Sequence, residues 1–286
     1  MKKLGFGLMR LPVKSENPTD IDQAMLNQMV DRYLEEGFTY FDTSYVYHNG
    51  ASETAIREAL VKRHDRSSFL LASKFPTFTM LKEEQVDAIF QEQLEKCGVE
   101  YFDFYLLHNL NRYLYKTEVQ DAHLFEHMKK WKEEGKIRHI AFSYHDDAEH
   151  LDRILAEHPE VEAVQIVVNY YDWDEPFIQA KKCCEVIAKH GAKVIAMEPV
   201  KGDMLAEVPE SVREKRNEEK AYRGKNGALF LRFFAEYGNS FLLVTTPQYC
   251  AYFTKSLCGF MIEPSKEKTI FQKKQSKKYS KWRKVK

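Results

Sequence analysis

Short apolar runs alternate along this chain with longer stretches in which apolar residues recur at helical spacing. The runs are nearly continuous in apolarity and rich in β-branched and aromatic residues, which is typical of parallel strands covered on both faces. This pattern predicts strands over 38–42, 69–74, 102–108, 137–143, 163–169 and 193–199, and a further one in the apolar run SFLLVTT at 240–246.

The intervening stretches predict amphipathic helices, most of which end on a glycine that can close a helix at its carboxyl end. Ser52 is expected to cap the second helix at its amino end, and Glu53 falls in the first turn of that helix. The predicted helices cover 23–37, 52–63, 83–98, 123–135, 177–191 and 227–238.

The ends of the first six predicted strands follow one another at intervals close to thirty residues. An interval of this size is what a repeated strand–helix–strand unit requires. Seven or eight such units in 286 residues favour a single α/β domain, a (β/α)8 TIM barrel, over an open doubly wound sheet. The first strand–helix connection also lacks the G-x-G-x-x-G motif that the doubly wound alternative would favour.

Composition narrows the class of protein further. The 43 basic and 43 acidic residues cancel, so the chain as a whole gives no signal for nucleic-acid binding. The five cysteines form no C-x-x-C motif, which indicates reduced thiols and a cytoplasmic location. No apolar run reaches the length of about 18 residues that a membrane span needs, and the amino-terminal residues do not resemble a signal peptide.

Polar side chains stand where the apolar strands end, and in a barrel of this kind the active site lies at that end of the strands. A lone Asp there is usually a cap, a lone Lys usually reaches into solvent, and a lone His is usually a satisfied rim residue. Because Asp, Lys and His close three consecutive strands, we expect them to converge. The candidates are Asp42, Lys74, His108, Ser143 with His145, Gln165 with Asn169, and Glu198, with Tyr45 and Tyr47 in the loop after Asp42.

The combination has a chemical logic. A phenol has a reference pKa of about 10, too high for easy proton donation near neutrality. A lysine beside it stabilises the phenolate, and a carboxylate holds the lysine in place. A neighbouring histidine can orient a carbonyl oxygen, so the group suits protonation of an oxygen that gains negative charge. Because no side chain supplies the hydride that completes a carbonyl reduction, a nicotinamide cofactor is implied.

Several segments, in order, resemble the motifs of the aldo-keto reductase superfamily over roughly residues 1–244. The resemblance is to the branch whose longer members often carry a ferredoxin-like iron–sulfur tail. The segments are LGFGLMRLP, FDTSYVYHNGASE, the end of LLASKF, FDFYLLH, GKIRHIAFSYH, VQIVVNYYD and MEPVKG.

The resemblance implies a barrel that reduces aldehydes or ketones to alcohols with NADPH or NADH. It makes Tyr47 the general acid, tuned by Lys74 and Asp42, with His108 orienting the substrate carbonyl. No metal is expected, the partner is a small carbonyl compound, and a monomer is the common form of the family.

On the cofactor side, the resemblance assigns Ser143 and Gln165 to the nicotinamide carboxamide. Met197 takes the position where many relatives stack a Tyr on the nicotinamide, and a thioether can pack there. Gly202 lies on the expected pyrophosphate path, followed by Asp203 where relatives of this branch tend to have a second Gly.

The carboxyl-terminal part departs from the family pattern, so we divide the chain into a barrel at 1–244 and an atypical basic segment at 245–286. Residues 264–286 hold ten Lys or Arg and a single acid. Neither the adenine-side motif resembling SGMSN-x-EQ-x-EN nor an iron–sulfur run C-x-x-C-x-x-C occurs after residue 244. No iron–sulfur cluster is therefore expected, and the last strand–helix unit is expected to be incomplete.

Three interpretations of residues 245–286 stay open. The segment can be a solvated, disordered end, or it can bind nucleic acid or anionic lipid, which the confinement of charge to one terminus makes a weaker hypothesis. The hypothesis we favour is a shift of reading frame near codon 245 that replaced the last unit. This hypothesis predicts weakened cofactor binding with the chemical residues intact.

Two other functions compete with a reductase. A cofactor-impaired or non-catalytic relative is favoured by the altered carboxyl-terminal segment, whereas the complete set of chemical residues favours the enzyme. A metal-dependent barrel hydrolase would need a His-x-His motif on the first strand and late carboxylates, and the sequence offers neither.

Overall fold

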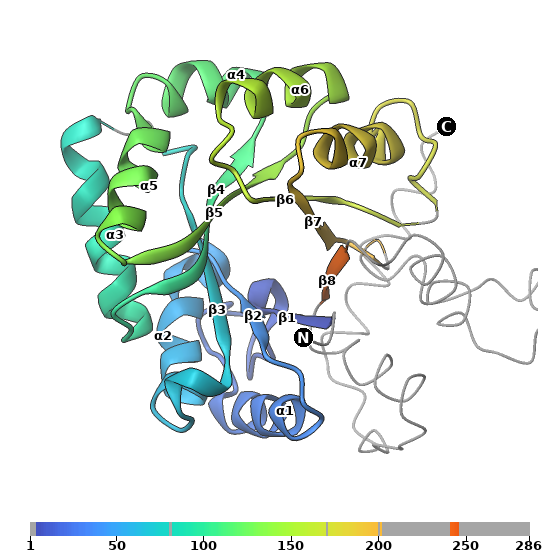
Figure 1. Ribbon diagram of the computed structural model, residues 1–286. Helices are drawn as coiled ribbons and strands as arrows, with labels where there is room; N and C mark the ends of the chain where they lie inside the picture. Colours follow the sequence, from blue (N-terminus) through green and yellow to red (C-terminus); the bar gives the residue numbers. More distant parts are fainter. Residues whose placement is uncertain (1–3, 80–81, 170, 200, 202–240, 246–286) are drawn as a thin grey trace, which may run out of the picture.

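Eight parallel strands close a barrel in chain order, and β8 pairs with both β7 and β1 (Figure 1). The computed structural model describes residues 4–79, 82–169, 171–199, 201 and 241–245. The predicted (β/α)8 barrel is confirmed. Apart from Thr245, which ends β8, the atypical segment predicted at 245–286 lies outside the described residues. The strands are β1 Leu4–Gly7, β2 Tyr40–Asp42, β3 Leu70–Phe75, β4 Phe102–Leu110, β5 Ile137–Tyr144, β6 Ala163–Val167, β7 Lys193–Met197 and β8 Phe241–Thr245.

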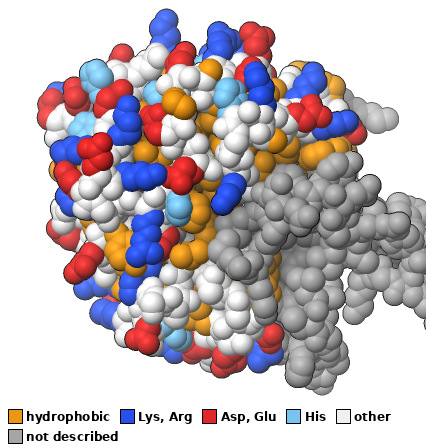
Figure 2. Space-filling view, in the orientation of Figure 1, with side chains coloured by type: hydrophobic (Ala, Val, Ile, Leu, Met, Phe, Trp, Pro, Cys, Tyr) orange, Lys and Arg blue, Asp and Glu red, His pale blue; other side chains and the backbone are white. Residues whose placement is uncertain are grey.

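Helices lie on the outside of the strands (Figure 1), and charged side chains of both signs are intermixed over the face in Figure 2. Five predicted helices are found, and the one predicted over 227–238 lies outside the described residues. The sequence analysis named no helix at α6, although Leu151, Ile154 and Leu155 carry the expected spacing. The helices are α1 Gln23–Glu35, α2 Ser52–Ile56, α3 Glu83–Cys97, α4 Arg112–Leu114, α5 Leu124–Glu133, α6 Ala148–Glu157 and α7 Ala180–Lys189.

The expectation that Ser52 caps α2 is wrong. Ala51 occupies the cap position and Ser52 is the first residue inside the helix. The hydroxyl of Ser52 lies 2.8 Å from that of Thr43, so it is used in a buried contact with the loop after β2 instead of with its own helix. A tertiary partner has replaced the local one that the sequence suggested.

A small cluster fills the barrel interior, mostly alanine and aliphatic side chains with the aromatic ring of Tyr40, and the larger apolar cluster lies between the strands and the helices. Interior positions alternate with exterior ones because successive strand residues face opposite sides of the sheet. The interior cluster consists of Tyr40, Ala72, Leu106, Ala141, Ala163 and Ile195.

One buried group in the outer layer has no polar partner. His150 on α6 is only 7% exposed, and neither ring nitrogen has a hydrogen-bond partner within the described part of the chain. Its ring stands edge-on to Tyr115, at a centroid distance of 5.5 Å. Burial lowers the pKa of His150, and Arg112 and Arg153 lower it further against the opposing effect of Asp146 and Asp147.

We expect His150→Phe to raise the free energy of unfolding by about 1 kcal/mol, because it removes unsatisfied buried nitrogens. The unfolded histidine has a pKa of about 6.5 and the folded one a lower pKa, so the unfolded state binds more protons as pH falls. The advantage of the variant should therefore grow between about pH 7 and pH 5. Urea denaturation across this range measures it, and an equal advantage at both pH values would contradict the assignment.

Candidate active site

The site residues sit directly above the interior layer of the barrel. Each interior residue of β2 to β7 is followed two positions later by a candidate, and residues two apart on a strand share a face. Because neighbouring strands are paired, these candidates lie around the mouth of the barrel; Ser143, for example, pairs with Gln165. The six candidates placed in this way are Asp42, Lys74, His108, Ser143, Gln165 and Met197.

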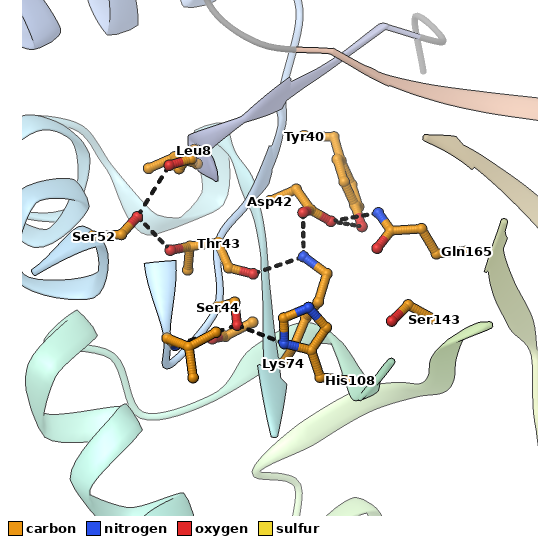
Figure 3. Close-up of polar contacts among 12 residues, drawn as sticks. Leu8, Tyr40, Asp42, Thr43, Ser44, Ser52, Lys74, His108, Ser143 and Gln165 are labelled. Atoms are coloured by element: carbon orange, nitrogen blue, oxygen red, sulfur yellow. Dashed lines mark hydrogen bonds and ion pairs between the residues drawn. The ribbon is translucent and has the colours of Figure 1, made fainter. Parts of the chain in front are cut away.

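A buried ion pair lies at the centre of this mouth (Figure 3). The side chains of Asp42 and Lys74 are only 3% and 1% exposed. The Lys74 ammonium donates to Asp42 Oδ1 and, at 2.8 Å, to the carbonyl oxygen of Thr43. Burial lowers the pKa of Lys74, but Asp42 and Tyr47 together raise it by more, so that pKa lies above its ordinary value.

The second oxygen of Asp42 binds two further side chains. Gln165 Nε2 donates to Asp42 Oδ2 at 3.1 Å, and the hydroxyl of Tyr40 reaches the same oxygen at 3.4 Å (Figure 3). Sequence analysis missed Tyr40 as a partner of Asp42, although its position two residues earlier on β2 puts both on one face. Asp42 thus joins β2, β3 and β6 at one point.

Tyr47 lies beside this ion pair in the loop after β2. The Lys74 ammonium is 4.8 Å from the centroid of the Tyr47 ring, which also meets His108 edge-on at 5.7 Å. Burial raises the pKa of the Tyr47 phenol, Lys74 works to lower it, and the Asp42 carboxylate adds to the rise. The lowering effect expected of Lys74 is present, but burial exceeds it and the pKa lies above its ordinary value.

His108 completes the group from the β4 side. Burial lowers its pKa to about 3, helped by Lys74 and His145, so the imidazole is neutral near pH 7. Its Nδ1 lies 3.0 Å from the hydroxyl of Ser44, which itself accepts from the Val46 N–H. If Ser44 donates to Nδ1, the ring proton sits on Nε2. Ser44 is a second partner that the sequence analysis missed.

The residues predicted to hold the nicotinamide lie on β5, β6 and β7. Ser143 and Gln165 are buried, and Ser143 Oγ accepts from the Asn109 N–H at 2.7 Å. Met197 is half-buried at the end of β7, paired with Val167. Gly202 lies outside the described residues.

Other strand-end residues have structural partners or point away. Asn169 bonds Asp172 at 2.8 Å and the Glu198 carbonyl at 3.2 Å, so it organises the loop after β6. Tyr45 turns toward α3, where its hydroxyl reaches Glu92 at 3.1 Å. Neither side chain contacts the charged groups of the ion pair, although the Tyr45 N–H donates to the Lys74 carbonyl oxygen at 3.4 Å.

A cavity of about 200 Å³ opens beside the ends of β5 and β6, against α7. Its walls include His145, Val167, Phe177 and Cys183. The cavity is not lined by Asp42, Tyr47, Lys74 or His108. We therefore keep the candidate active site at the ion pair. Within the described residues, no three His, Cys, Asp or Glu side chains gather as metal ligands.

Removing both members of the ion pair should cost less than the sum of the two single removals. We expect Lys74→Met to lower the free energy of unfolding by about 3–5 kcal/mol, because Asp42 is left buried without its counter-charge. The double variant with Asp42→Asn should recover roughly 1–3 kcal/mol relative to the sum of the single changes. Chemical denaturation of the four proteins measures this coupling.

The matched control is Lys62→Met, which breaks a helix-surface pair with Glu58 between side chains 52% and 42% exposed. We expect a loss within about 0.5 kcal/mol. Additive losses at Asp42 and Lys74 would show that the two charges do not depend on each other.

Comparison with known proteins agrees with the barrel fold. The sequence model of the Aldo/keto reductase family matches residues 3–255. The probable aldo-keto reductase 1 of Glycine max is 30% identical over 174 residues, 58% of this chain and 47% of that protein. The aldo-keto reductase yakc of Schizosaccharomyces pombe is 28% identical over 193 residues, 63% of this chain and 54% of that protein.

Solved structures show the same fold. An aldo-keto reductase from Klebsiella pneumoniae in complex with NADPH superimposes with a TM-score of 0.65 at 17% identity, covering 97% of this chain and 90% of that one. The chain belongs to the aldo/keto reductase family. Its matches span about half the length of these curated relatives.

The family is one of oxidoreductases, and relatives in it bind NADP or NADPH. None of the helices in the described part of the chain combines the length and apolarity needed to cross a membrane.

Proposed function

We propose that this protein reduces aldehydes or ketones to alcohols with NADPH or NADH. The observation that carries the proposal is the convergence of Tyr47 and His108 on the buried Asp42–Lys74 pair. The names of relatives support it: yakc is named for NADP(+), and the Klebsiella structure is a complex with NADPH. All four residues come from β2, β3, β4 and the loop after β2, so one chain can form the chemical group.

The cofactor side is supported by the donor set at the end of β5 and β6. Ser143 accepts from the Asn109 N–H and so keeps its own O–H for donation. Gln165 gives one N–H to Asp42 and keeps an amide oxygen. A primary carboxamide needs one donor and one acceptor in this arrangement, and the Met197 thioether can pack on a ring face. When bound, the nicotinamide would supply the hydride.

The chain's own residues would then manage the proton. Tyr47 donates its phenolic proton to the carbonyl oxygen as negative charge develops there. Lys74 lies close enough to stabilise the resulting phenolate, and Asp42 holds Lys74 against the strand ends. Neutral His108 donates from Nε2 to the same substrate oxygen, because Ser44 occupies its Nδ1.

The specific alternative is a relative whose cofactor binding is impaired. It is favoured by the sequence after residue 244, where the adenine-side motif of the family is missing. We propose that residues 1–244 form the barrel and residues 245–286 an atypical segment. Because the chemical residues lie in the first part and the missing motif belongs to the second, loss of cofactor affinity would not require loss of the chemical group.

Tyr47→Phe tests the general acid. Turnover of a panel of aldehydes and quinones should fall about 10²–10⁴-fold, because the proton donor is gone while the ring remains. Cofactor affinity, measured by quenching of protein fluorescence, should stay within about twofold of the parent. Equal turnover by the variant would refute the assigned acid.

Cofactor titration tests the alternative. We expect NADPH and NADH to bind this chain with similar, weak affinity, because the segment that reads the 2′-phosphate in relatives has no counterpart here. Fluorescence titration of both nucleotides measures the two Kd values. Absence of binding at millimolar nucleotide would exclude the reductase, whereas tight and selective NADPH binding would refute the impaired alternative.

A further inference from the structure

A buried acidic side chain lies behind the loop that carries Tyr47, in the layer between the barrel and the helices. Glu53 on α2 is fully buried, and its Oε1 accepts from Ser73 Oγ and Gln93 Nε2, each at 2.7 Å. Its Oε2 lies 3.2 Å from Lys96 Nζ but outside hydrogen-bond geometry. Burial raises the pKa of Glu53, while Gln93, Ser73 and Lys96 work to lower it.

Gln93 extends this contact to the backbone of the candidate site. Its Nε2 also lies 3.2 Å from the carbonyl oxygen of Lys74, which accepts from the Tyr45 N–H at 3.4 Å. Its Oε1 accepts from the hydroxyl of Tyr105 on β4. Both ends of the Gln93 amide are thus hydrogen-bonded, and its nitrogen contacts the backbone where the loop after β2 bonds to β3.

Lys96 makes a second link to the same loop. Its ammonium lies 4.5 Å from the centroid of the Tyr45 ring, and its side chain is 21% exposed. An ammonium in this position is attracted to the negative face of the aromatic ring. Tyr45 is therefore held through its N–H and through its ring, two residues before Tyr47.

We propose that Glu53 is a positioning residue for the reduction, acting with Lys96 and Gln93 to set the loop that carries Tyr47 relative to Lys74. The inference rests on the proposed function of Tyr47. Glu53 lies on the far side of β3 from the ion pair, because Ser73 and Lys74 are successive strand residues and face opposite sides. It acts through other residues and touches no reacting atom.

The main test is Glu53→Gln, which keeps the shape but turns one oxygen into a donor facing Ser73, Gln93 and Lys96. We expect kcat per folded molecule to fall about tenfold or more, because a small misplacement of a catalytic group is costly. The KM and the Kd for NADPH should change less than about twofold. The matched control is Glu84→Gln on α3, at a side chain that is 76% exposed, and it should leave all three constants unchanged.

Lys96→Met keeps the test decisive if Glu53→Gln does not fold. It removes the counter-charge of Glu53 and the contact with Tyr45 but keeps the aliphatic stem, so kcat should fall in the same direction. Lys96→Arg restores the charge and should recover most of the loss. If thermal stability falls in the folded variants while kcat per folded molecule is unchanged, Glu53 is only structural and the proposal is overturned.

Titration of the Tyr47 phenol separates this inference from the proposed function. The ultraviolet difference between the protein and its Tyr47→Phe variant reports that phenol without any turnover. A shift of its apparent pKa in Glu53→Gln or Lys96→Met supports positioning even where the parent protein reduces no carbonyl. An unchanged apparent pKa in both variants overturns it, whatever the activity of the parent protein.

Discussion

The buried pair of Asp42 and Lys74 is the interaction on which the rest of the barrel mouth depends. Two charges that are almost completely excluded from water are unfavourable unless each is matched by opposite charge and by hydrogen bonds. The matching partners come from β2, β6 and the loop after β2, so the pair can exist only when these elements are correctly placed. The same geometry places an ammonium beside Tyr47, where a phenolate would need it.

Much of this arrangement follows from the sequence because it depends on two simple periods. The interval of about thirty residues predicts the barrel, and the polar ends of the strands predict which residues meet at its mouth. The period of two within each strand then decides which side chains face the interior. Ala72 lies in the interior, so Lys74, two residues later, lies above it on the same face. Ser143 follows Ala141 in the same way. Strand pairing decides which residues meet at the mouth of the barrel, and the sequence predicts that pairing well.

What the sequence did not reveal are partners chosen by tertiary packing. The local sequence predicts that Ser52 caps a helix, yet its hydroxyl is hydrogen-bonded to that of Thr43. Ser44 and Tyr40 look like ordinary loop and strand residues until His108 and Asp42 are placed beside them. The direction of a pKa shift also depends on tertiary packing and cannot be predicted from the sequence. Burial raises the pKa of Tyr47 against the effect of Lys74, and this burial depends on which residues cover the ring.

The proposed function divides chemistry from cofactor binding along the chain. The candidate proton-handling residues end at His108 on β4, whereas the candidates for the nicotinamide begin at Ser143 on β5 and continue toward the carboxyl terminus. Two described contacts join these halves: Gln165 donates to Asp42, and Ser143 accepts from the Asn109 N–H on β4. On this proposal, a change confined to the last part of the chain would alter cofactor affinity before it altered the proton donor. Of the two contacts, the one between Gln165 and Asp42 reaches the ion pair directly, so on the proposed function an occupied nicotinamide site would steady the pair through it.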